Sequence, residues 1–201
     1  IAERPDFGAE IEEDGVKIDL RQYRFDLRGE VELGSGFLEK LRLRTGYADY
    51  RHVELEGGDV GTLFLSSAIE TRLELLQNER NGWRGASGVQ FLTRDFEAIG
   101  EEAFVPPSQT RSLGAFTLQE FSFGAFDVEA ALRFDHASLE AKTINAARRF
   151  NNVSAALGFG YTTGDLKLGV NLSRTARAPS VEELFSDGPH VATQSFEIGD
   201  V

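Results

Sequence analysis

The sequence of 201 residues contains no cysteine and no methionine. The lack of cysteine excludes disulfide bonds and thiolate metal sites, and it fits compartments where unpaired thiols are a liability. The chain starts at Ile1, has no methionine anywhere and carries no recognisable signal peptide, so we expect it to have been processed or cut. Nothing in its length demands more than one domain.

Long hydrophobic runs and excess positive charge are missing as well. No run of eighteen or more apolar residues occurs, and this excludes a transmembrane helix, whereas a transmembrane barrel stays open because its strands alternate apolar and polar residues. Asp and Glu number 33 against 21 Lys and Arg, which gives a formal net charge of -12. This balance disfavours nucleic acid and an anionic membrane surface as partners.

Along much of the chain, apolar and polar residues alternate at every second position. Near the start, Tyr23, Phe25 and Leu27 fall on one face of a predicted strand, while Arg24 and Asp26 fall on the other. The same alternation returns after each turn signal, which predicts antiparallel strands with one wet face.

The predicted chain has eight such strands of about 12 to 17 residues, against a usual length of roughly 5 to 6. Short turns are predicted near Ser35, Asn81, Gly124 and Gly164. Long loops are predicted at residues 53–61, 98–110 and 137–149 and from 177 onward, all at one end. Bacterial outer-membrane barrels have short periplasmic turns and long external loops. We therefore predict an all-β fold: about eight antiparallel transmembrane strands of a larger β-barrel.

One face of this sheet is predicted to be an apolar exterior and the other a polar interior. The exterior is predicted to carry Leu41, Leu43, Phe126, Val128, Leu132, Leu157, Phe159, Leu168 and Val170. Phe116 and Leu118 are expected to continue the same apolar face. Because a soluble sheet also alternates, a soluble antiparallel β-sheet binding module stays open as an alternative.

A short helix is predicted after the last strand. Ser180 and Glu183 have the spacing of a capping box, in which each side chain accepts a hydrogen bond from the other residue's backbone N–H. Pro179 keeps the preceding residue extended, so a strand leads directly into one helical turn. We expect this segment to fold toward the barrel interior.

The segment around this turn resembles TonB-dependent receptors. Its matching motifs are RAPS at 177–180, EELF at 182–185, GPHVAT at 188–193 and FEIG at 196–199. The stretches "DLRQYRFDLRGE", "LRTGYADYRH" and "RDFEAIGEEAFVPPSQT" are similar to the zinc-uptake branch of that family. The resemblance implies that residues 1–201 are part of a 22-stranded receptor barrel, whose plug domain and remaining strands are absent from this sequence.

Candidate ligand-binding residues are expected in the predicted external loops. They are His52, Glu101, Glu102 and His190, and of these His190 and Glu102 are the candidate metal ligands. Imidazole and carboxylate groups suit Zn²⁺. No resident cofactor is predicted, and zinc enters only as possible cargo. His136 is a weaker candidate.

The predicted function is import of a scarce nutrient, zinc or another metal species, through the outer membrane of a Gram-negative bacterium. The expected partners are outer-membrane lipid, the TonB complex through the absent plug, and a small nutrient or metal ligand, with no nucleic acid. Catalysis is not predicted. An outer-membrane hydrolase is the remaining alternative, because Ser, His and Asp all occur within residues 186–195, but the chain has no G-x-S-x-G nucleophile motif.

Overall fold

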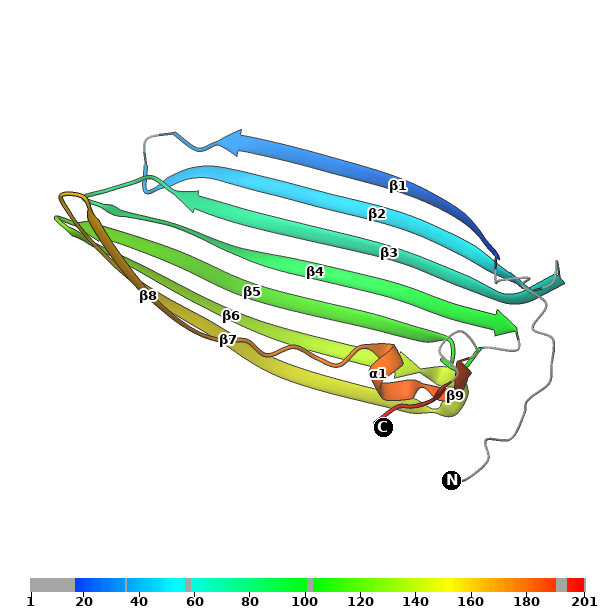
Figure 1. Ribbon diagram of the computed structural model, residues 1–201. Coiled ribbons are helices and arrows are strands. Elements are labelled where there is room, and N and C mark those ends of the chain that lie inside the picture. Colours follow the sequence, from blue (N-terminus) through cyan, green and yellow to red (C-terminus); the bar gives the residue numbers. More distant parts are fainter. Residues whose placement is uncertain (1–16, 35, 57–58, 101–102, 191–194, 201) are drawn as a thin grey trace, which may run out of the picture.

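A computed structural model of the chain describes residues 17–34, 36–56, 59–100, 103–190 and 195–200 (Figure 1). Its main element is one antiparallel sheet of eight strands, in which each strand pairs with its neighbours in the sequence. The strands are β1 (Lys17–Glu32), β2 (Leu38–Glu56), β3 (Asp59–Gln77), β4 (Trp83–Gly100), β5 (Ser108–Phe123), β6 (Phe126–Ala141), β7 (Ala146–Thr163) and β8 (Leu166–Arg174). The predicted antiparallel all-β architecture is therefore confirmed.

The turns at one end of the sheet are as short as predicted. Between β3 and β4, Asn81 and Gly82 have φ of 53° and 77°, and Arg80 and Trp83 exchange two backbone hydrogen bonds around them. An Asn-Gly pair suits this two-residue hairpin turn because both positions require a positive φ.

At the other end the strands run further than predicted. Residues 53–56 and 59–61 belong to β2 and β3, and most of residues 137–149 belong to β6 and β7, joined through a 3₁₀ turn at Lys142–Ile144. The prediction of long loops at these two places was wrong, because cross-strand pairing continues as far as Glu56 and Asp59 between β2 and β3, and as far as Ala141 and Ala146 between β6 and β7. Long connections are found between β4 and β5 and after β8.

The register assigns each side chain to one of two faces. We call the face with Phe25, Leu43 and Val128 the outer face, and the face with Arg24 and Arg42 the inner face. All nine residues predicted for the apolar exterior share the outer face.

The prediction for Phe116 and Leu118 was wrong, because both lie on the inner face. The partner of Phe116 across β5 and β6 is Arg133, an inner-face residue. The Phe116 ring is covered by the guanidinium of Arg72 at 4.0 Å from its centroid, and Arg133 lies at 5.9 Å. Cation–π contacts of this kind allow an aromatic ring among charged side chains.

The apolar side chains of the outer face form a band that crosses the strands obliquely. Following the register from strand to strand, Tyr23 of β1 is aligned with Ala147 of β7. The band starts at Tyr23 on β1 but only at Val153 on β7, which is about six residues, or roughly 20 Å, further along the strand. The six strand spacings between them amount to about 29 Å, so a level band requires a strand tilt of about 35°.

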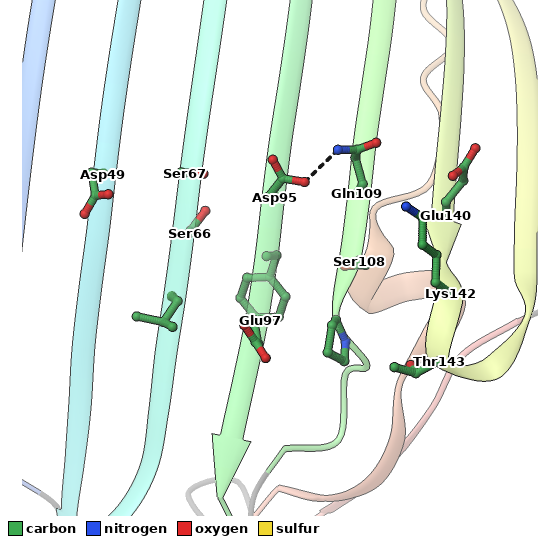
Figure 2. Close-up of a pocket in the computed structure, with 13 residues that line it drawn as sticks. Asp49, Ser66, Ser67, Asp95, Glu97, Ser108, Gln109, Glu140, Lys142 and Thr143 are labelled. Carbon is green, nitrogen blue, oxygen red and sulfur yellow. Dashed lines mark hydrogen bonds between the residues drawn. The ribbon is translucent and has the colours of Figure 1, made fainter.

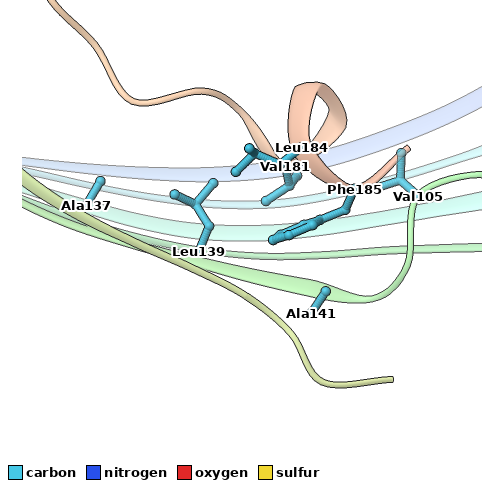
Figure 3. Close-up of a cluster of buried hydrophobic side chains, with 7 residues drawn as sticks. All are labelled: Val105, Ala137, Leu139, Ala141, Val181, Leu184 and Phe185. Atoms are coloured by element: carbon cyan, nitrogen blue, oxygen red, sulfur yellow. The ribbon is translucent and has the colours of Figure 1, made fainter. Parts of the chain in front are cut away.

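The segment after β8 folds back over the inner face. It contains α1 (Val181–Phe185), β9 (Asp187–His190) and β10 (Ser195–Ile198), and β9 and β10 form a separate two-stranded sheet. Figure 3 shows three side chains of α1 packed against the end of β6 and Val105. The buried cluster consists of Val105, Ala137, Leu139, Ala141, Val181, Leu184 and Phe185.

Of the helices in the described ranges, none has the length and apolar character needed to cross a membrane.

Candidate functional site

A hollow of about 360 Å³ lies on the inner face, near the end of the sheet where α1 docks. Four neighbouring strands line it, and its polar and aromatic side chains are Gln22, Tyr50, His52, Phe64, Ser66, Arg94 and Phe96. These residues come together because they occupy alternate positions on the inner face of β1 to β4.

His52 lies at the centre of the aromatic part of this hollow. Its ring stacks on Phe64 with centroids 4.4 Å apart and meets Tyr50 edge to face at 5.4 Å. Its Nε2 lies 3.7 Å from Glu54 Oε1. Its Nδ1 is buried and finds no hydrogen-bond partner among the described residues. Imidazole ring nitrogens are common metal ligands, and this one makes no hydrogen bond within the described residues that would compete for it.

Arg94 connects the hollow to α1. Its Nε donates a hydrogen bond of 3.1 Å to Ser66 Oγ, and its guanidinium lies 5.1 Å from the Phe96 ring centroid. Its Nη2 lies 3.5 Å from Glu182 Oε1 on the helix. A ligand in the hollow would therefore meet a cation that also holds the docked segment.

The helix begins with the predicted capping box. The backbone N–H of Glu183 donates to Ser180 Oγ at 3.2 Å, and the backbone N–H of Ser180 donates to Glu183 Oε2 at 2.8 Å. Arg177 donates two further hydrogen bonds to the Glu183 carboxylate. The Arg177 guanidinium, with the Ser180 N–H second, lowers the pKa of Glu183 to about 2.

Of the four predicted ligand residues, only His52 has a side chain within the described part of the structure. His52 lies on the inner face of β2 and not in a loop. Glu101 and Glu102 lie outside the described residues, as does the side chain of His190, whose backbone ends β9. β9 adjoins the segment that follows residues 101–102, because the N–H of Asp187 donates to the carbonyl of Phe104 at 2.8 Å. Within the described ranges, no three His, Asp or Glu side chains are grouped to hold a metal ion.

Sequence reasoning missed the partners of His52. Tyr50, Phe64, Arg94 and Phe96 surround it only when the register of four strands is known. The signal available in the sequence was a cluster of aromatic residues at polar-face positions near the end of adjacent predicted strands.

The fold and its two faces define a class of protein. A tilted sheet of long antiparallel strands, apolar on one face and charged on the other, is the wall of a transmembrane β-barrel. In such a wall, the apolar face is the one that faces lipid and the charged face is the one that lines the lumen. α1 lies on the luminal side.

Comparison with known proteins identifies the family. Residues 3–200 match the family described as TonB dependent receptor-like, beta-barrel, and the chain belongs to it. Members of this family are outer-membrane proteins of Gram-negative bacteria. The predicted family is confirmed, whereas the zinc-uptake branch stays a prediction.

Among solved structures, the chain is similar to one titled Copper transporter OprC. The TM-score is 0.76 at 18% sequence identity, and the match covers 87% of this chain and 33% of that protein. At this identity the likeness supports the fold alone. The chain spans about a third of the length of that structure.

Proposed function

We propose that this chain is a wall segment of a longer receptor that imports a metal ion, zinc or another, or a small metal-containing nutrient, through the outer membrane. A plug domain and further strands outside this sequence would complete the receptor, and the plug would connect it to the TonB complex. The outer membrane has no nucleotide pool, so uptake there requires energy supplied by such a partner.

The observation that carries this proposal is the placement of His52. His52 lines the inner-face hollow, which Arg94 connects to the docked segment through Glu182, and its Nδ1 is buried with no hydrogen-bond partner among the described residues. The backbone of His190 belongs to that segment, and residues 101–102 directly follow β4. The proposed capture site therefore combines imidazole from His52 and His190 with a carboxylate from Glu101 or Glu102, with any remaining ligands coming from the plug.

Metal titration of the full-length receptor tests this proposal. His52→Ala, His190→Ala and Glu102→Ala are expected to weaken zinc binding, and copper is titrated in parallel because the structural neighbour bears the name of a copper transporter. Binding by the wild type should weaken as the pH is lowered, since a protonated imidazole cannot ligate a metal.

His136→Ala is the matched control. His136 lies on the outer face, where its Nδ1 is 2.8 Å from Asn151 Oδ1, so its loss should leave metal affinity unchanged. If all three site variants bind both metals as the wild type does, the metal assignment is wrong and the receptor carries another nutrient.

The other two functional classes have less support. A soluble β-sheet module does not account for the exposed outer band, and the transporter family does not favour a hydrolase. Growth of a receptor-deficient strain on limiting metal, restored by the wild type and not by His52→Ala, would link the site to uptake.

A further inference from the structure

The ion pairs of the eight-stranded sheet lie on its inner face. In the part of the chain that the structure describes, every ion pair formed within this sheet joins two inner-face residues, as Arg72 and Glu74 do at 2.7 Å. Arg94 is different, because its carboxylate partner belongs to α1: its Nη2 lies 3.5 Å from Glu182 Oε1. The docked segment therefore supplies a negative charge to the inner face.

Arg94 is held in the inner-face hollow by two contacts that do not involve α1. Its Nε donates to Ser66 Oγ at 3.1 Å, and its guanidinium lies 5.1 Å from the Phe96 ring centroid. Ser66 belongs to β3 and Phe96 to β4, the strand that also carries Arg94. Loss of the Glu182 carboxylate would therefore leave the positive charge of Arg94 in the hollow without its partner.

The charge of the hollow depends on whether α1 is docked. Among the described residues that line it, Arg94 is the only side chain with a formal charge. Glu54 lies beside it, 3.7 Å from His52 Nε2. These two charges cancel, and docking of α1 adds the carboxylate of Glu182. A divalent cation near His52 is attracted to the net negative charge of the docked arrangement, whereas an anion is repelled.

We propose that Glu182 is a specificity-determining residue of the hollow: by docking, α1 supplies the carboxylate with which the hollow accepts a free metal cation and disfavours an anionic metal complex. This inference rests on the proposed function, in which His52 is a metal ligand. Metal binding and docking of α1 are then coupled. Thermodynamic linkage requires that a bound cation favours the docked helix by the same factor by which docking favours the cation.

Calorimetric titration of the full-length receptor with Zn²⁺ alone, and separately with Cu²⁺ alone, tests the inference. Glu182→Gln should weaken binding about threefold to fivefold, the effect expected for partly exposed charges. Arg94→Gln should strengthen binding to a similar extent, and the double variant should return close to the wild type. The loss in Glu182→Gln should shrink at high salt, because salt screens the charges.

Asp95→Asn is the matched control. Asp95 follows Arg94 on β4 but lies on the outer face, where Figure 2 shows it in a hollow of about 470 Å³ with Gln109 Nε2 donating to its Oδ1 at 2.7 Å. The change removes one negative charge at the same level of the sheet, on the opposite face. It should leave the affinity for both metals unchanged.

Hydrogen exchange at the Leu184 amide separates a lost charge from a lost helix. Three apolar side chains keep α1 packed without Glu182, so protection in the metal-free Glu182→Gln variant should be close to that of the wild type. Zn²⁺ should raise this protection in the wild type and raise it less in Glu182→Gln. Reduced protection in metal-free Glu182→Gln, with weak binding that Arg94→Gln does not restore, would indicate a structural role and overturn the inference.

The remaining outcomes distinguish the inference from the proposed function. Wild-type affinity for both metals in Glu182→Gln, with binding still weakened by His52→Ala, would overturn the inference alone. Weaker binding in Arg94→Gln would also overturn it, because the guanidinium would then be attracting the ligand. A wild-type receptor that binds neither metal, or a His52→Ala variant that binds both as the wild type does, would overturn the proposed site and the inference with it.

Discussion

At the scale of single residues, Glu183 fixes the start of α1 through two kinds of contact. Its carboxylate accepts hydrogen bonds from Arg177 and from the backbone of Ser180, and both favour its charged form. The cap therefore depends on an ionised Glu183, in a segment that packs three apolar side chains against the luminal wall.

The lowered pKa of Glu183, about 2 against an ordinary 4.5, gives this cap a defined pH dependence. Because the folded pKa is depressed, the contribution is fully present above about pH 4.5 and is lost as the pH falls toward 2. Glu183→Gln should reduce the hydrogen-exchange protection of the Leu184 amide, which donates to the Ser180 carbonyl, at pH 6 and hardly at all near pH 2.

Glu129→Gln is the control for that measurement, because Glu129 lies on the inner face far along β6 from α1. Protection of Leu184 that is the same in Glu183→Gln and the wild type at pH 6 would contradict the assigned cap.

At the scale of secondary-structure elements, the two faces of β8 differ in what they contact. Val170 is on the outer face and 70% exposed in the described part of the chain, and Asn171 is its inner-face neighbour. Such exposure of an aliphatic side chain fits a strand surrounded by lipid.

Val170→Arg should therefore lower the free energy of unfolding by about 2 to 4 kcal/mol if the position is near the bilayer midplane, and Asn171→Arg by much less. Chemical denaturation of the full-length receptor in lipid vesicles measures both. Equal losses at the two positions would indicate that the outer face is not in contact with lipid.

The elements also indicate what the sequence can predict. Period-two alternation was sufficient for the strands because nearly every one has an apolar outer face. It failed at β5, where the outer positions include Thr117 and Gln119 and the inner ones include Phe116. Phe116 is accommodated by arginines from β3 and β6, and such contacts appear only after the strands are paired.

The candidate site was predictable only in part for the same reason. His52 stood out as a rare residue type, but its aromatic partners come from separate strands aligned by the register. The surface on which α1 packs, in contrast, can be recognised in the sequence. The inner face of β6 changes from charged residues such as Arg133 and Asp135 to Ala137, Leu139 and Ala141.

At the scale of the whole molecule, we propose that the sheet separates lipid from a hydrated lumen. The oblique apolar band, the luminal ion pairs and the inward position of α1 all follow from one orientation. With that orientation, the hollow lined by His52 and Arg94 opens on the luminal side, where the proposed function needs it.

The most direct test uses the absence of cysteine from this chain. Single cysteines are introduced at positions 128 to 135 of β6 in the full-length receptor, with any cysteine elsewhere in that receptor replaced by serine, and spin-labelled in lipid vesicles. Collision with oxygen, which concentrates in lipid, and with a water-soluble nickel chelate is then measured at each site. We predict strict alternation: labels at Val128, Ala130, Leu132 and Phe134 should favour oxygen over nickel, and the odd-numbered positions should not. Equal accessibility at odd and even positions, or the reverse alternation, would contradict the lipid-facing barrel wall.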